Sequence, residues 1–129
     1  MEKVDGIGGV FFRARDPEAL AKWYEENLGV SRVPGDYETP PWQTKAGSTV
    51  FGPFQMDTEY FGEKSQQWMI NFRVSDLDAM AAQLRKNGVK VDVTHDDQPN
   101  GRFARLADPE GNPIELWEPG GADPGASVK

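Results

Sequence analysis

The chain contains an internal duplication, and this feature limits its fold more than any other. The segment Val-Phe-Phe-Arg-Ala-Arg-Asp at residues 10–16 reappears as Ile-Asn-Phe-Arg-Val-Ser-Asp at residues 70–76, an offset of 60 positions. The pair Gly29-Val30 matches Gly88-Val89 in the same way, at an offset of 59. Similarity at a fixed spacing indicates two copies of one structural unit. The 129 residues are therefore predicted to form two related halves.

Each copy predicts a strand followed by a capped helix. Residues 10–14 and 70–74 are rich in β-branched and aromatic side chains, which favour strands. Asp16 and Pro17 then provide a helix cap and a first helical residue, and Asp76 provides the second cap. Apolar residues follow at spacings of three and four, as on the buried face of a helix: Leu20, Trp23, Tyr24 and Leu28, then Leu77, Met80, Ala81 and Leu84.

Three shorter strands are predicted after each helix, which Gly29 and Gly88 are expected to end. They cover roughly residues 31–34, 42–45 and 48–54 in the first half, and 90–94, 103–107 and 113–117 in the second. Each half is therefore a βαβββ module, and the fold class is α+β. We expect a first module over residues 1–59, a linker over 60–66, a second module over 67–118 and a disordered tail over 119–129.

Composition and charge exclude several classes of partner and location. The chain has no cysteine, so it needs no oxidising compartment. Its net charge of -7 repels phosphate backbones and anionic lipid surfaces, which argues against nucleic acid and membranes as partners. The first nine residues contain Glu2, Lys3 and Asp5 and no apolar run of the length that a secretory signal requires. We expect a cytoplasmic protein.

The duplicated βαβββ unit resembles the vicinal-oxygen-chelate superfamily, which includes glyoxalase I, bleomycin-resistance proteins and extradiol dioxygenases. The resemblance covers nearly all of residues 6–118. It is carried by Arg13-Ala14-Arg15-Asp16-Pro17, by residues 72–77 and by the segment from Asp108-Pro109-Glu110-Gly111-Asn112 to Leu116. It implies that the two modules pair into a curved sheet around a cleft, and that substrates bind in this cleft.

The metal ligands that this resemblance implies are mostly missing. In metal-dependent relatives the first strand of each module supplies a ligand, and these positions fall on Gly9 and Met69. Glycine has no side chain, and a thioether is a poor ligand for hard divalent metals. The last strand of the second module keeps Glu115, but its counterpart in residues 49–55 has no carboxylate or imidazole. A catalytic metal site needs about three protein ligands, so we expect no metal and no cofactor.

The only histidine, His95, lies beside two aspartates in the turn-like residues 94–97. This group is either a weak metal site or a solvated loop.

Strand alternation separates the two faces of the predicted sheet. Ile70, Phe72, Ile114 and Leu116 are expected to face the helices. The opposite face would line the cleft, with Glu115 as the candidate general base. The candidate ligand-binding residues are Phe11, Arg13, Phe51, Met69, Asn71, Arg73, Arg105 and Trp117.

Two interpretations of this face remain open and are not exclusive. Apolar walls with a few polar groups are typical of a small-molecule pocket. Alternatively, Arg13, Arg73 and Arg105 pair with Glu115 across the sheet and only satisfy charge. Trp42 and Tyr60 fall in loop or linker regions, from which they would close over the cleft or cover a subunit interface.

Three functions follow from these observations. The first is a metal-independent protein of the bleomycin-resistance type that binds a small aromatic or anionic molecule. The second is an enzyme: a glyoxalase-like lyase or isomerase, which depends on a metal through atypical ligands or is metal-free with Glu115 as base. The resemblance alone also implies a lactoylglutathione lyase-like or a dioxygenase-like activity. The third is a structural or regulatory subunit. By analogy with the family, we also expect a homodimer.

Overall fold

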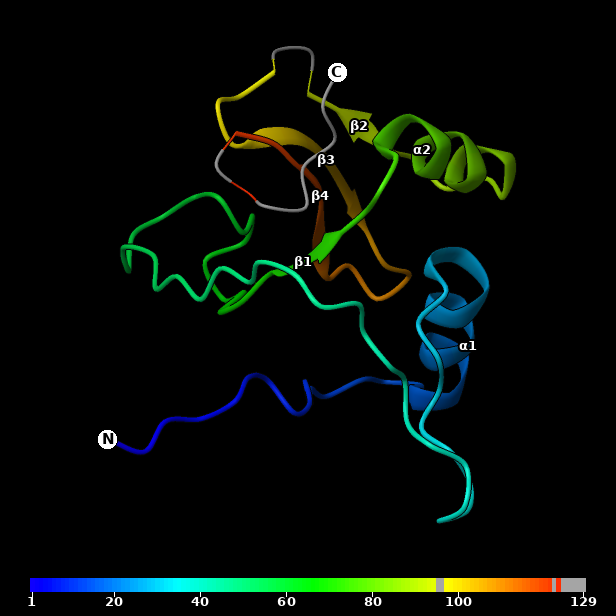
Figure 1. Cartoon of the computed structure of the whole chain (residues 1–129). Helices are drawn as coiled ribbons and strands as arrows, with labels where there is room; N and C mark the ends of the chain where they lie inside the picture. The colour runs from blue at the N-terminus through cyan, green and yellow to red at the C-terminus, as the bar shows by residue number, and fades with distance from the viewer. Residues whose placement is uncertain (95–96, 122, 124–129) are drawn as a thin grey trace.

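The computed structural model describes residues 1–94, 97–121 and 123. Two helices and four strands lie within them (Figure 1). In chain order these are α1 (Pro17–Leu28), β1 (Ile70–Arg73), α2 (Leu77–Lys86), β2 (Asp92–Val93), β3 (Gly101–Ala107) and β4 (Pro113–Pro119). None of the helices in this part of the chain has the length and apolar character needed to span a membrane.

The strands form one mixed sheet in the order β1-β4-β3-β2. β1 pairs with β4 in parallel, whereas β3 pairs antiparallel with both β4 and β2. All four strands lie where the sequence predicted the strands of the second module, although β2 is reduced to two residues. The α+β class is therefore confirmed, with β1, α2, β2, β3 and β4 following each other as βαβββ.

The first half of the chain differs from its prediction. Within residues 1–69, all of which are described, α1 is the only regular element, and residues 10–14, 31–34, 42–45 and 48–54 form no strand. A strand forms only where its backbone groups pair with a neighbouring strand, and these segments have no such neighbour. The arrangement of two tandem modules is thus not confirmed.

Both helices begin at the predicted residues, and Gly29 ends α1 as predicted, whereas α2 ends at Lys86 with Asn87 as its C-cap, before the predicted Gly88. The Asp16 and Asp76 carboxylates accept hydrogen bonds from the backbone N–H groups of Ala19 and Ala79, at 3.1 and 3.0 Å. Such a cap satisfies one of the free donors of the first helical turn. Gly29 takes the left-handed conformation, with φ of 71°, that ends α1.

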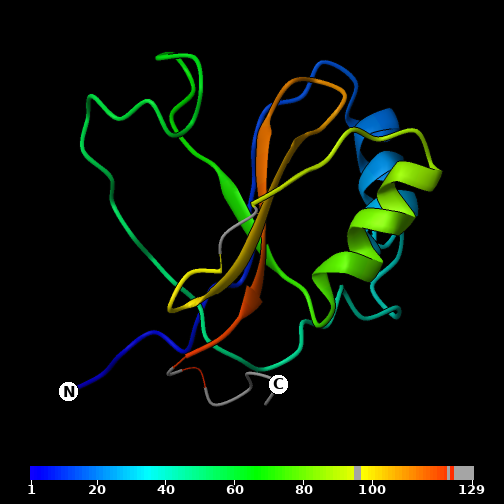
Figure 2. The same ribbon diagram turned by 90° about the horizontal axis from the view of Figure 1, so that it is seen from above.

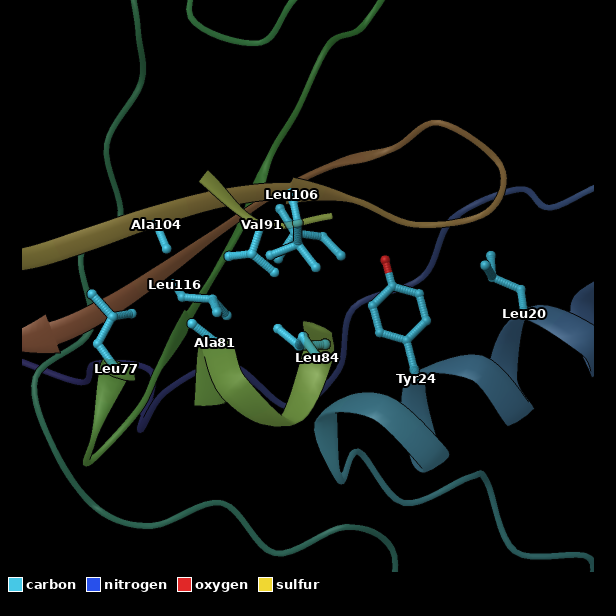
Figure 3. Close-up of a cluster of buried hydrophobic side chains, with 10 residues drawn as sticks. Leu20, Tyr24, Leu77, Ala81, Leu84, Val91, Ala104, Leu106 and Leu116 are labelled. Atoms are coloured by element: carbon cyan, nitrogen blue, oxygen red, sulfur yellow. The ribbon is translucent and has the colours of Figure 1, made fainter. Parts of the chain in front are cut away.

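The helices cover one face of the sheet, and the core lies between them and the strands. Figure 3 shows Leu77, Ala81 and Leu84 of α2 pointing toward Leu106 and Leu116 of the sheet. The predicted apolar stripes and the helix-facing positions of Ile114 and Leu116 are confirmed, because the side chains that form them pack in this cluster. Its buried members are Leu20, Tyr24, Leu77, Ala81, Leu84, Val91, Ala104, Leu106, Ile114 and Leu116.

The turn between β3 and β4 ties α1 to the sheet. Asp108 accepts a hydrogen bond of 2.7 Å from the Tyr24 hydroxyl, in a buried environment. Glu110 accepts bonds of 2.7 and 3.0 Å from the backbone N–H groups of Arg15 and Asp16. The Asp-Pro-Glu-Gly-Asn sequence thus holds the first helix against the second half of the chain.

Two predicted features fall partly or wholly outside the described residues. His95, with its neighbour Asp96, lies outside them, as do residues 122 and 124–129 of the expected tail. The start of that tail, Pro119, is the last residue of β4.

Candidate ligand-binding site

Polar and aromatic residues share the sheet face opposite the helices. Asn71, Glu115 and Arg105 are paired across β1, β4 and β3, and Arg73, Trp117 and Phe103 are paired two positions further along. Directly paired residues point to the same side of a sheet. Figure 2 shows that residues 50–66 run on this side, with both helices on the other. We call residues 45–62, which supply the contacts described next, the strap.

Glu115 lies at the centre of this face and is 7% exposed. Its Oε1 accepts a hydrogen bond of 2.8 Å from the Asn71 amide, and its Oε2 accepts one from the Tyr60 hydroxyl. Both donors are neutral groups. The Glu115 carboxylate is therefore held by hydrogen bonds rather than by an arginine.

Arg105 holds Tyr60 in a second way. Its guanidinium carbon lies 4.5 Å from the centroid of the Tyr60 ring, a cation–π distance, and its Nη2 donates to the Tyr60 carbonyl at 2.8 Å. Burial, followed by the hydrogen bond to Glu115, raises the pKa of the Tyr60 hydroxyl. Arg105 Nε is buried and has no hydrogen-bond partner among the described residues.

Arg73 contacts the other end of the strap. Its Nη2 donates to the Lys45 carbonyl at 2.8 Å. A Cβ at Gly47 would lie 2.0 Å from Arg73 Nη1, so the absent side chain lets the guanidinium approach the backbone this closely. Both arginines thus donate hydrogen bonds to backbone carbonyl groups of the strap.

Aromatic rings lie on the same face as Asn71, Glu115 and the two arginines. The rings of Phe103 and Trp117 are nearly parallel, with centroids 6.5 Å apart, and the Trp117 indole donates to the Asn100 carbonyl at 2.8 Å. On the strap, the rings of Phe54 and Tyr60 stack with centroids 5.7 Å apart. The site therefore offers flat apolar surfaces beside the Glu115 carboxylate and the two guanidinium groups.

The structure brings some of the predicted site residues together and leaves others apart. Asn71, Arg73, Arg105, Glu115 and Trp117 share the face just described. Phe11 and Phe51 are 92% and 86% exposed, so neither packs into the site. Arg13 lines a surface depression of about 310 Å³ next to Glu110 and Asn112, and Met69, half-buried, precedes β1. For these four residues, as for the five that share the face, ligand contact stays a prediction.

That depression and a second one of about 310 Å³ beside Trp23 meet at Arg15 and Glu110. They lie where the β3–β4 turn meets the start of α1, and Glu115 lines neither of them. The Glu110 carboxylate there already accepts hydrogen bonds from two backbone N–H groups. We therefore assign both depressions to the contact between α1 and the β3–β4 turn and not to the ligand site.

Tyr60 is the main contributor that sequence reasoning did not place. The sequence predicts that this residue closes over a cleft or covers a subunit interface, but nothing in the local sequence indicates Glu115 as its partner. Phe54 and Phe103 were not identified. A cluster of aromatic residues between positions 51 and 61 was the available signal.

The donor set does not fit the metal site that the resemblance implies. Across residues 1–94, 97–121 and 123, no three His, Cys, Asp or Glu side chains come together in a group that would hold a metal ion. Glu115 is surrounded by Tyr60, Asn71 and Arg105, and neutral amide and hydroxyl donors with a guanidinium do not form a three-ligand site.

One family model and several solved structures match the chain. The model, described as a glyoxalase-like domain, matches residues 9–117. The antibiotic-binding protein TnmS3 from Streptomyces sp. CB03234 is 25% identical, with a TM-score of 0.54 over 81% of this chain and 87% of that one. A glyoxylase/bleomycin resistance protein/dioxygenase domain from Frankia sp. EAN1pec is 15% identical, with a TM-score of 0.56 over 89% and 98%. No curated protein matches the chain.

Proposed function

The chain belongs to the glyoxalase-like domain family, and on that premise we propose that it binds a small aromatic molecule with an anionic group, without a metal ion, on the sheet face around Glu115. In this role the protein sequesters its ligand and does not transform it.

The unpaired donor of Arg105 is the observation that carries the proposal. A buried N–H group without a partner costs about 1–3 kcal/mol, and Arg105 Nε has no partner among the described residues. An acceptor oxygen of the ligand would satisfy this donor. The guanidinium of Arg73, on the same face, presents a planar fork of donors that matches a carboxylate, so a contact between Arg73 and the anionic group is both strong and directional.

Two further observations support this ligand chemistry. The bonds from Arg73 and Arg105 to the strap end on neutral carbonyl groups, and a bond in which the acceptor is also charged would be stronger. Phe103 is partly exposed and its ring lies parallel to that of the buried Trp117, so it provides a flat surface for an aromatic ring. The similarity to TnmS3, described as an antibiotic-binding protein, supports a binding role over a catalytic one.

The alternative of a lyase or isomerase with Glu115 as general base is less well supported. A base must present an unoccupied lone pair to the proton that it abstracts. Each Glu115 oxygen accepts one hydrogen bond, from Asn71 or from Tyr60, and the residue is 7% exposed, so its remaining lone pairs become accessible only when Tyr60 leaves. Among the described residues, Asn71 then still donates to Glu115, and an amide is not an acid or base for proton transfer.

The test is titration calorimetry with 2-naphthoate, an aromatic anion. We expect saturable binding, and we expect Arg73→Ala to weaken it by more than about tenfold, the equivalent of about 1.4 kcal/mol. Arg85→Ala is the matched control, because Arg85 Nη2 also donates to a backbone carbonyl, that of Val91 at 2.9 Å, but from the helix layer. If 2-naphthoate does not bind, or if Arg73→Ala and Arg85→Ala behave alike, the proposal is wrong.

A further inference from the structure

We infer that Tyr60 occupies the place of the ligand, and that the ligand class is therefore a hydroxyaromatic molecule whose hydroxyl group donates to Glu115 after the strap moves away. This inference rests on the proposed function and adds to it the group that faces Glu115.

The contacts of the Tyr60 side chain are those that a bound phenol would make. Its hydroxyl donates to Glu115, and its ring lies over the Arg105 guanidinium and against Phe54. None of these three contacts involves the backbone of residue 60. A free molecule with an aromatic ring and a hydroxyl group would therefore reproduce the contacts to Glu115 and Arg105.

The chemistry of Glu115 decides which group a ligand must present there. An ionised carboxylate only accepts hydrogen bonds, so the ligand needs a donor at this point, and an anionic group would be repelled. The rise in the pKa of Tyr60 fits this, because the site keeps its phenol protonated. The anionic group of the ligand is then expected at Arg73.

The positions of Arg73 and Glu115 set the distance between the anionic group and the hydroxyl group of the ligand. Arg73 is paired with Trp117, which lies two residues beyond Glu115 on β4. Two residues along a strand span about 7 Å. A two-ring aromatic system with a hydroxyl at one end and a carboxylate at the other matches this arrangement.

The strap is weakly enough attached to exchange with a ligand. It contains no helix or strand, and its backbone is held to the sheet face near its two ends by the arginine bonds to Lys45 and Tyr60. Its apolar side chains Phe51 and Met56 are 86% and 103% exposed. Segments with few buried apolar contacts open at low free energy. Tyr60 itself is 43% exposed, so its ring is accessible to a competitor.

The experiment compares three probes by titration calorimetry: 2-naphthoate, 6-hydroxy-2-naphthoate and 6-methoxy-2-naphthoate. The hydroxyl probe should bind at least about tenfold more tightly than the methoxy probe, because a hydrogen bond to a charged acceptor contributes about one decade or more. Tyr60→Ala should tighten binding of the hydroxyl probe by about tenfold, since the internal competitor is removed. Tyr37→Ala is the control, because Tyr37 is fully exposed at 108%.

A second measurement, tryptic cleavage, reports whether the strap has moved away from the sheet face. Lys45 is its first residue and Lys64 lies two residues beyond its end, so displacement by the hydroxyl probe should increase tryptic cleavage there, whereas most ligands protect against proteolysis. Equal affinity for the hydroxyl and methoxy probes would overturn the inference, as would weaker binding by Tyr60→Ala or unchanged cleavage. In those cases binding of 2-naphthoate would still support the proposed function. Failure of all three probes to bind would overturn both.

Discussion

Tyr60 and Glu115, 55 residues apart in the sequence, are joined by a hydrogen bond from the phenolic hydroxyl to the buried carboxylate. This bond fixes the strap to the centre of the sheet face. It also satisfies the Glu115 oxygen that the Asn71 amide does not reach. The same pair thus has two roles, because it stabilises the unliganded protein and must be broken for the ligand exchange that we propose.

Tyr60→Phe is expected to lower the free energy of unfolding by about 1–2 kcal/mol, because a hydrogen bond to a charged acceptor is lost while the ring stays. The value should lie near the lower end, since Tyr60 is 43% exposed. Denaturant unfolding of Tyr60→Phe, Glu115→Gln and the double variant measures it as a double-mutant cycle. Strictly additive losses would show that the two side chains are not coupled.

Stability is expected to fall at alkaline pH. Burial and the bond to Asp108 raise the pKa of Tyr24, and burial and the bond to Glu115 raise that of Tyr60, both from an ordinary value of 10.0. Below that value both states keep these protons, and the stabilisation is complete. Above it, the unfolded chain loses protons that the folded protein retains, so the free energy of unfolding decreases as pH rises.

Tyr24→Phe provides the check on this pH dependence. Denaturant unfolding at a series of pH values from about 8 to 11, spanning the ordinary tyrosine pKa, should give a shallower decrease for the variant than for the parent protein. The variant should also be about 1–2 kcal/mol less stable at neutral pH, because Asp108 loses its buried donor. Parallel curves would contradict the assignment to Tyr24.

Metal binding at the position used by metal-dependent relatives is not expected. Gly9 and Met69 stand where two ligands would be required, and Glu115 alone does not hold a divalent ion. After dialysis against Zn²⁺, Ni²⁺, Fe²⁺ or Mn²⁺, elemental analysis should detect less than one bound equivalent. A stoichiometric metal that is lost in Glu115→Ala would reverse this expectation.

A homodimer is expected in solution. Apolar side chains of the first half, among them Val33, Trp42 and Val50, are 90%, 41% and 77% exposed, and extended apolar surfaces of this kind favour association. Sedimentation at micromolar concentration should give about twice the monomer mass of 14.3 kDa. A monomer would contradict the expectation, and Trp42→Ala should shift the equilibrium toward it.

Local physical chemistry in the sequence determined the helices, their caps and the strands of the second half. Asp16, Asp76 and Gly29 act through hydrogen bonds and backbone conformations within a few residues of themselves, so their effect is visible without the fold. The alternation of residues 113–117 likewise placed Ile114 and Leu116 toward the helices and Glu115 away from them, because side chains of a strand point alternately to its two faces.

Only the tertiary structure decided what surrounds Glu115 and how the first half of the chain lies. Strand propensity in residues 10–14 and 48–54 did not lead to strands, since a strand depends on a partner that the segment itself does not encode. The contact of Tyr60 with Glu115 joins positions 55 residues apart. Such a contact arises from the path of the whole chain across the sheet, and no local pattern specifies it.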